Sequence, residues 1–355
     1  MLFLGAGASV QFDKPTTVVF KKELQSRKIH GNSILNSFLN TNGLNDIEEV
    51  LQAMKEIREV AAGGTGYSYA SKYLLNGVPA SPEISDFRTT FQYLLQNMSS
   101  NENFISHEIF ERYAWNEKDN NILFQFYEGL FELLTHKVDE IYVATTNYDQ
   151  AIENFCLHSG QGYSCVDGFR IDEKSPLVWN KENFDKKSNT RPEKLVFLLK
   201  IHGSLNWMWD GSKIIKVASP EYNGPSGTNI YIAPTKSPKI PLEKEPFTTL
   251  LSLFEAKLLE ADICIAIGYA FRDIDINEIF NRFTIKGGHL ILISPNCRIN
   301  YSKNYCKKEL ESDEIHDAWA MQNAPNNIHF IRKLVQLDTH QNIFSSIKAE
   351  LENIE

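Results

Sequence analysis

The amino-acid sequence predicts an α/β protein: a mostly parallel β-sheet flanked by helices, with a helical insert and a smaller irregular lobe. Five short runs are mostly apolar rather than alternating, which is typical of strands covered on both faces. Segments with helical spacing separate the runs, and each run ends in glycine or in polar residues. The runs are Met1–Leu4, Glu140–Thr145, Leu195–Ile201, Asp262–Ile267 and His289–Ile293.

Unusual residues stand at the carboxyl end of every run. In an open parallel sheet, ligands bind at this edge, near the point where the strand order reverses. We therefore expect five separate segments to form one site. They are Gly5–Ser9, Thr146–Asp149, His202–Ser204, Gly268–Asp273 and Ser294–Asn296.

The spacing of apolar residues predicts helices between the strands. Asp46–Val60 combines an acidic first turn with apolar residues every three or four positions, so we expect one amphipathic helix there. The same pattern predicts helices over Leu123–His136, Phe247–Leu259 and Thr339–Leu351.

We predict a single domain over residues 1–355. Within it, residues 31–118 form the helical insert, and residues 326–355 form a closing segment. Residues 159–245 are rich in Gly, Pro, Asn, Ser and Lys and are expected to form the irregular lobe, with a short strand at Asn229–Ile232.

Charge and composition exclude some classes of function. The net charge is −9 and the pI is about 5.6, which disfavours a general nucleic-acid binder because such binding needs a dense basic surface. The five cysteines form no C-x-x-C pair, so neither a zinc ribbon nor a disulfide framework is indicated. Cys264 lies within an apolar run and is expected to pack as a small hydrophobic residue.

The apolar start of the chain is too short for a signal peptide, and no apolar stretch approaches the roughly 20 residues that span a bilayer. We therefore expect a soluble, cytoplasmic protein with no membrane contact.

The glycine segment Gly5–Ser9 follows a strand and is expected to precede a helix. Glycines there let the backbone approach a phosphate, and a helix N-terminus favours its negative charge. The third glycine of a G-x-G-x-x-G motif is replaced by Val10, so a simple tight turn explains the segment equally well.

Two further segments carry the chemistry. Asn147 can orient a ribose hydroxyl or a water and Asp149 can accept a hydrogen bond from an amide, although either can simply cap the following helix. His202 is flanked by Gly203 at the predicted ligand edge. A lone histidine is usually structural, but this position favours a general base.

The remaining candidates have alternatives that the sequence leaves open. Arg272 can bind a phosphate or form a surface ion pair with a neighbouring aspartate. Ser294 and Asn296 can contact an adenine ribose or form a plain turn. Trp207 and Trp209 can line a pocket, but such pairs more often pack a lobe.

In chain order, these motifs resemble the sirtuin superfamily: G-A-G-x-S at Gly5–Ser9, T-x-N-x-D at Thr145–Asp149 and H-G at His202. The resemblance is closer to bacterial sirtuin-like proteins of anti-phage defence, which favour T-T-N-Y-D and G-Y-x-F-R-D. Thr145–Asp149 and Gly268–Asp273 have both sequences.

The resemblance implies a Rossmann-like fold that binds NAD, with no metal. Asn147 and His202 would be catalytic, and Asp149 would face the nicotinamide. The residues expected to contact the rest of NAD are Gly5, Ala6, Gly7, Ser9, Gly268, Tyr269, Ser294 and Asn296.

Two departures distinguish this chain from protein-deacylating sirtuins. It has no four-cysteine zinc module, and Phe12–Thr16 replaces the usual G-I-P-D-F-R segment. Defence-type proteins that look like NAD hydrolases share both departures. The expected reaction is therefore hydrolysis of NAD to nicotinamide and ADP-ribose. A deacylase or ADP-ribosyltransferase, and a non-catalytic NAD or ADP-ribose sensor, are the alternatives.

The resemblance also implies partners. Because an unregulated NAD hydrolase would kill its host, we expect a homo-oligomer or a separate ATPase or nucleic-acid-sensing protein to control activity. Direct nucleic-acid binding by this chain is not expected.

Overall fold

A computed structural model describes residues 1–27, 29, 33–61, 100–115, 120–135, 140–160, 162–172, 175–184, 194–209, 213–217, 229–232, 245–271, 273–294, 298–299, 318–319, 327–331 and 340–354. Several sequence predictions fall wholly or partly outside these residues. Among them are Arg272, Asn296, the side chain of Trp209, and much of the predicted helical insert before residue 100.

The central element is a seven-stranded parallel sheet with the order β14-β11-β10-β1-β2-β6-β3. The five predicted strands form its middle, which confirms the predicted fold class. Two edge strands were not predicted, because each is only four residues long. The strands are β1 Leu2–Leu4, β2 Glu140–Thr145, β3 Tyr163–Val166, β6 Lys194–Lys200, β10 Ile263–Ile267, β11 His289–Ile293 and β14 Ile328–Ile331.

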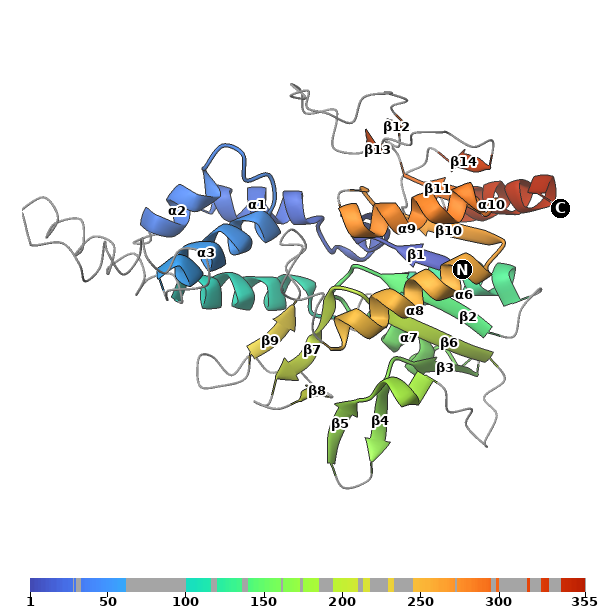
Figure 1. The fold of residues 1–355 in the computed structure, drawn as a ribbon, viewed down its shortest axis with the longest axis horizontal. Helices are drawn as coiled ribbons and strands as arrows, with labels where there is room; N and C mark the ends of the chain where they lie inside the picture. The colour runs from blue at the N-terminus through green and yellow to red at the C-terminus, as the bar shows by residue number, and fades with distance from the viewer. Residues whose placement is uncertain are drawn as a thin grey trace, which may run out of the picture.

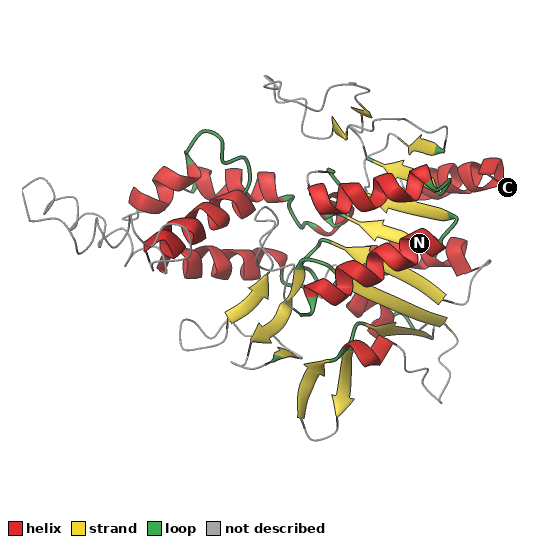
Figure 2. Cartoon of the chain, in the orientation of Figure 1, coloured by secondary structure: helices red, strands yellow, loops and turns green. Residues whose placement is uncertain are grey.

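Helices cover both faces of this sheet (Figures 1 and 2). In β1, Phe3 packs with α8 and α9 on one face, while Leu2 and Leu4 pack with α6, α7 and α10 on the other. This arrangement explains why the inner strands are mostly apolar rather than alternating. The covering helices are α6 Asn120–Thr135, α7 Ala151–His158, α8 Phe247–Glu260, α9 Ile274–Ile285 and α10 His340–Ile354.

Strand register aligns the carboxyl ends of the strands. Leu4 pairs with Thr145 and with Ile267, and these pair in turn with Lys200 and Ile293. The residues that follow these five therefore start from one row at one edge of the sheet. The chain runs outward from β1 through β2 on one side and from β10 through β11 on the other, so the strand order reverses between β1 and β10. Ligands bind at such a point in open α/β sheets.

The helical insert shares a buried core with α1 Thr17–Ser26, which precedes it in the chain. The helices α1, α2 Ser33–Leu39 and α3 Ile47–Ala61 gather on one side of the molecule, and residues 100–113 are also helical (Figure 1). Asp46 caps α3, as its acidic start predicted. The buried residues of this group also include Tyr148, from the predicted site segment Thr146–Asp149, and Leu205, which directly follows the segment His202–Ser204. The insert therefore contacts the ligand edge of the sheet directly.

The stretch 159–245 is more regular than its composition indicates. Its β3 and β6 join the main sheet, and its other described strands form a five-stranded antiparallel sheet in the order β4-β5-β8-β7-β9. Because these strands are short, the glycine and proline residues between them dominate the composition. The strands are β4 Phe169–Asp172, β5 Ser175–Trp179, β7 Gly203–Trp209, β8 Ile214–Lys216 and β9 Asn229–Ile232.

The expectation that a helix directly follows the glycine segment is wrong. Two 3-10 turns, Ala6–Ala8 and Val10–Phe12, follow β1, and α1 begins only at Thr17 with Thr16 as its cap. The reason lies in the hydrogen bonds of the segment: the N–H groups of Gly5 and Gly7 donate to the carbonyl groups of Ile267 and Gly268 across the sheet edge.

None of the described helices is long and apolar enough to cross a membrane.

The backbone of Gly268 lies directly against the glycine segment. Its φ is +64°, and a Cβ added there would stand 2.3 Å from the backbone nitrogen of Ala8. A Cβ at Gly5 or Gly7 would in turn meet the backbone of Gly268 or Tyr269 within 3 Å. Glycine is therefore required at this crossing for space as well as for conformation.

A matched pair of substitutions separates these two requirements. Gly160 has a similar φ of +67° but no described atom within 4 Å of an added Cβ. We expect Gly160→Ala to lower the free energy of unfolding by about 1 kcal/mol through backbone strain alone. Gly268→Ala should cost at least about 2 kcal/mol more, because it adds a backbone clash. Denaturant unfolding measures both, and equal costs would contradict the close approach.

Candidate functional site

Asn147 links the carboxyl ends of β1 and β2. Its Nδ2 donates to the carbonyl oxygen of Gly5 and to Ser9 Oγ, both at 3.0 Å. Because a carbonyl oxygen can only accept, the amide nitrogen must be the atom that faces Gly5. Asn147 Oδ1 is then left buried, with no hydrogen-bond donor among the described residues. A buried acceptor of this kind costs free energy unless a ligand or a water supplies a donor.

Asp149 accepts a hydrogen bond on each of its carboxylate oxygens. Its Oδ1 accepts from the backbone N–H of Ala151, the first residue of α7, at 3.0 Å, while the cap position itself is Gln150, which makes no side-chain cap hydrogen bond. Its Oδ2 accepts from Ser9 Oγ at 2.6 Å, and the side chain is buried. Ser9 thereby joins Asp149 to Asn147, and the glycine segment fixes both side chains.

His202 is held by a partner that the sequence did not reveal. Its Nε2 lies 3.1 Å from Asp273 Oδ2, and the two side chains are only 6% and 10% exposed. The other oxygen of Asp273 accepts from the backbone N–H groups of Asp275 and Ile276, so the same carboxylate caps α9. The sequence indicated an ion pair with Arg272 as one alternative for Asp273, and no periodic pattern indicated that the chain would turn it towards His202.

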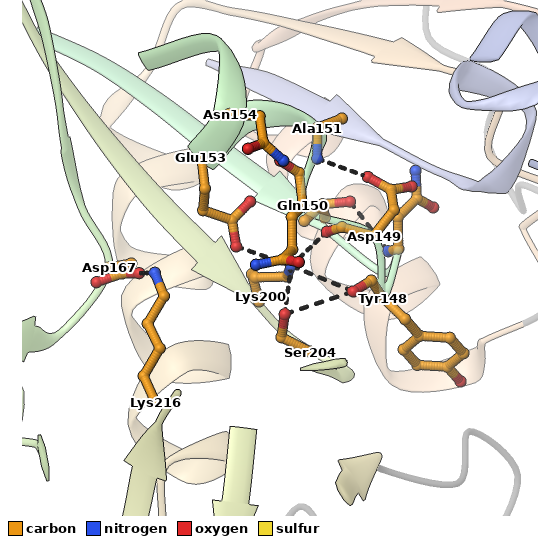
Figure 3. Close-up of polar contacts among 12 residues, drawn as sticks. Tyr148, Asp149, Gln150, Ala151, Glu153, Asn154, Asp167, Lys200, Ser204 and Lys216 are labelled. Carbon is orange, nitrogen blue, oxygen red and sulfur yellow. Dashed lines mark hydrogen bonds and ion pairs between the residues drawn. The ribbon is translucent and has the colours of Figure 1, made fainter. Parts of the chain in front are cut away.

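Lys200 is a second residue that sequence reasoning missed. Its side chain is 1% exposed, and its Nζ reaches four acceptors at the ends of β2 and β6 (Figure 3). It donates to Ser204 Oγ at 2.7 Å, to the carbonyl of Asp149 at 2.5 Å and to that of Tyr148 at 3.4 Å, and it pairs with Glu153 Oε1 at 3.0 Å. The lysine therefore ties the segment of Asn147 to the segment of His202. A lysine at the end of an apolar strand was the signal that could have indicated it.

The helical insert reaches this segment through Tyr148. The Tyr148 hydroxyl donates to Glu48 Oε1 of α3 at 2.5 Å, and its ring packs edge-on against Tyr113. Burial, and then the Glu48 carboxylate, raise the pKa of Tyr148 well above its ordinary value, so its hydroxyl remains a donor. The residue after Asn147 is thus anchored in the insert.

The residues predicted to contact the adenosine side are placed differently from one another. Gly268 and Ser294 directly follow β10 and β11 at the ligand edge. The Tyr269 ring packs against Phe3 and Phe271 in the core under that edge, and its hydroxyl is buried without a partner among the described residues. Asn296 lies outside the described residues. The NAD contacts of Gly5, Ala6, Gly7, Ser9, Gly268, Tyr269, Ser294 and Asn296 stay predictions.

Other candidates have structural roles. Trp207 is buried and packs against Phe169 and Phe247, as the simpler alternative proposed. Cys264 is fully buried, and burial raises its pKa to about 12, which confirms its expected role as a small apolar residue. In the part of the chain that the structure describes, no group of His, Cys, Asp and Glu could hold a metal ion.

Comparison with known proteins supports the predicted resemblance. Residues 142–316 match a family model described as SIR2-like domain, and this span includes Asn147, His202 and Asp273. The match supports a relationship to the sirtuin superfamily and leaves the glycine segment outside. Comparison with curated proteins gives no match.

Three solved structures are also similar, each to 99% of this chain. They are a Sir2 homolog–NAD complex (12% identity, 90% of that chain, TM-score 0.46), a mutant Sir2 homologue bound to 2′-O-acetyl ADP ribose (13%, 92%, 0.41) and a mutant Sir2 homologue bound to ADP ribose (12%, 92%, 0.43).

The Lys200 network predicts a measurable asymmetry between buried and exposed ion pairs. Lys200→Met leaves Glu153, which is 12% exposed, without its cation, and we expect a loss of about 3 kcal/mol in the free energy of unfolding. The double variant Lys200→Met with Glu153→Gln should recover part of this loss, because no carboxylate is then left unpaired.

The exposed pair Lys257–Glu260, with side chains 31% and 65% exposed, serves as the control. Lys257→Met should cost about 1 kcal/mol or less. Equal losses for Lys200→Met and Lys257→Met in urea denaturation would contradict the role of Lys200 as a link between the two segments.

Proposed function

We propose that the protein binds NAD at the carboxyl edge of the sheet and hydrolyses its nicotinamide–ribose bond, with Asn147 and His202 as catalytic residues. The match to a SIR2-like domain supports NAD as the substrate. The unpartnered Oδ1 of Asn147 and the His202–Asp273 pair, at the ends of adjacent strands, support the reaction.

The two proposed catalytic residues occupy equivalent positions. Asn147 and His202 each stand two residues beyond a registered pair, Thr145 and Lys200, on adjacent parallel strands. The segments that carry them are further joined where the N–H of Leu205 donates to the carbonyl of Tyr148 at 3.1 Å. This placement supports an amide and an imidazole that face one bound sugar.

The unsatisfied oxygen of Asn147 carries the proposal. Because Asn147 Nδ2 already donates to Gly5 and Ser9, the side chain can offer a ligand only its acceptor, Oδ1. A ribose hydroxyl or a water molecule supplies the missing donor. Asn147 therefore orients either the sugar or the nucleophile, and these hydrogen bonds fix it before the substrate arrives.

In the proposed reaction, the bond between ribose C1′ and the nicotinamide nitrogen breaks, and its electron pair neutralises the cationic ring. The ribose passes through an oxocarbenium-like state, as in other glycoside cleavages. Water adds to C1′ and gives its proton to His202, which leaves nicotinamide and ADP-ribose. No protonation of the leaving group is needed, so one base is sufficient.

Substitution of either residue tests the mechanism. We expect Asn147→Ala and His202→Ala each to lower NAD turnover by roughly 10²-fold or more, because one removes the positioned acceptor and the other the base. Nicotinamide release from NAD alone measures this loss. His158→Ala, which changes an exposed histidine at the end of α7, should leave turnover unchanged. Unchanged NAD loss in both site variants would remove the mechanism.

The same assay separates the alternatives. A deacylase or ADP-ribosyltransferase consumes NAD only when an acceptor other than water is present, and a sensor binds NAD without consuming it. The absence of a four-cysteine module in the sequence favours water as the acceptor. The proposal extends to NAD depletion in anti-phage defence, controlled by homo-oligomerisation or by a separate ATPase or nucleic-acid-sensing protein. Turnover by the purified chain, alone and with the product of its neighbouring gene, tests this extension.

A further inference from the structure

We propose that Asp273 is a positioning residue that fixes the proton of His202 on Nε2, so that Nδ1 is the nitrogen that accepts a proton during the reaction. This inference rests on the proposed function for its catalytic consequence. It concerns a residue that lies in the loop after β10, more than 70 positions from the histidine that it orients.

The hydrogen bonds of Asp273 define the direction of the contact. Oδ1 accepts from the N–H groups of Asp275 at 3.0 Å and Ile276 at 3.2 Å, and Oδ2 lies 3.1 Å from His202 Nε2. A carboxylate that accepts on both oxygens has no hydrogen to donate. The hydrogen of this contact therefore belongs to Nε2, and a neutral imidazole then has its lone pair on Nδ1.

The loop that carries Asp273 is held in an unusual conformation. Phe271 has a φ of +54°, which is rare for a bulky residue, and its ring is nevertheless buried against Tyr269 and Phe280. The side chain of Asn277 also holds this turn by donating to the carbonyl of Phe271 at 2.7 Å. Strain of this kind persists only where the surroundings enforce it, and it is common at functional sites. Here it turns the chain so that Asp273 can reach His202 and cap α9 together.

The simpler alternative is that Asp273 serves only as the cap of α9. Asn and Ser are equally good caps, so both preserve that role. Asn, however, has a single oxygen for two tasks. If that oxygen caps the helix, its amide nitrogen faces Nε2 and donates, which forces the hydrogen of His202 onto Nδ1. Ser is too short to reach His202 and leaves the imidazole free to adopt either tautomer.

The test therefore uses Asp273→Asn and Asp273→Ser. We expect both variants to melt within about 2 °C of the wild type, because the cap is retained. We expect kcat for NAD hydrolysis to fall by roughly 10²- to 10³-fold in Asp273→Asn, with KM changed less than about threefold. Asp273→Ser should fall less, since a fraction of its imidazole has the productive tautomer.

A direct readout of the tautomer does not depend on turnover. Nitrogen-15 NMR of histidine-labelled protein distinguishes protonated Nε2 from protonated Nδ1, and the spectrum of His202→Gln assigns the signal among the nine histidines. We expect protonated Nε2 in the wild type and protonated Nδ1 in Asp273→Asn. The same tautomer in both proteins, or wild-type kcat in Asp273→Asn, would overturn the inference. If the wild type consumes no NAD, the proposed function fails, and the NMR result alone decides the role of Asp273.

Discussion

The close contact between two backbone segments constrains the whole ligand edge of this protein. Gly268 lies against Gly5 and Gly7 with no room for a side chain, and the N–H of Gly7 donates to the carbonyl of Gly268 at 2.9 Å. This contact fixes the loop after β1 relative to the loop after β10. The first loop supplies Ser9, which bonds to Asn147, and the second leads to Asp273, which bonds to His202. The two loops that meet at these glycines therefore each orient one of the proposed catalytic side chains.

The network beneath this edge uses polar groups where an ordinary core would use apolar ones. The Lys200 ammonium and the Glu153 carboxylate are both removed from water, which is costly unless every group is paired. Their compensation is the set of carbonyl and hydroxyl acceptors at Tyr148, Asp149 and Ser204. Such a network requires one particular arrangement of the segments that carry Asn147 and His202, because a shift of either segment leaves a buried polar group unpaired. It holds the two loops in register more strictly than apolar packing would.

The sequence was sufficient to predict the parts of the fold that depend on periodic burial. The five inner strands and four helices follow from apolar runs and helical spacing, and parallel strands bring their carboxyl ends together whatever the details of the loops. The position of Asn147 and His202 at the ligand edge was predictable because polar residues directly after buried strands are unusual. Asp273 and Lys200 were not, because their roles depend on long-range contacts. Asp273 reaches His202 because Phe271 adopts a left-handed backbone conformation. The role of Lys200 depends on acceptors in the segments that follow β2 and β6. The glycine segment was wrongly predicted to lead directly into a helix. The hydrogen bonds of Gly5 and Gly7 to the end of β10 prevent this, and local sequence does not reveal them.

The shared core of the insert has a thermodynamic consequence for the ligand edge. Tyr148 and Leu205 belong to the same buried cluster as Val50 and Ile109 of the insert, yet each stands within three residues of a proposed catalytic side chain. Local unfolding of the insert therefore cannot proceed without loosening the loops on which Asn147 and His202 are mounted. By thermodynamic linkage this dependence is reciprocal. A ligand that stabilises those loops also protects the insert from unfolding. A partner that binds the insert changes the affinity of the ligand edge for its ligand by the same factor.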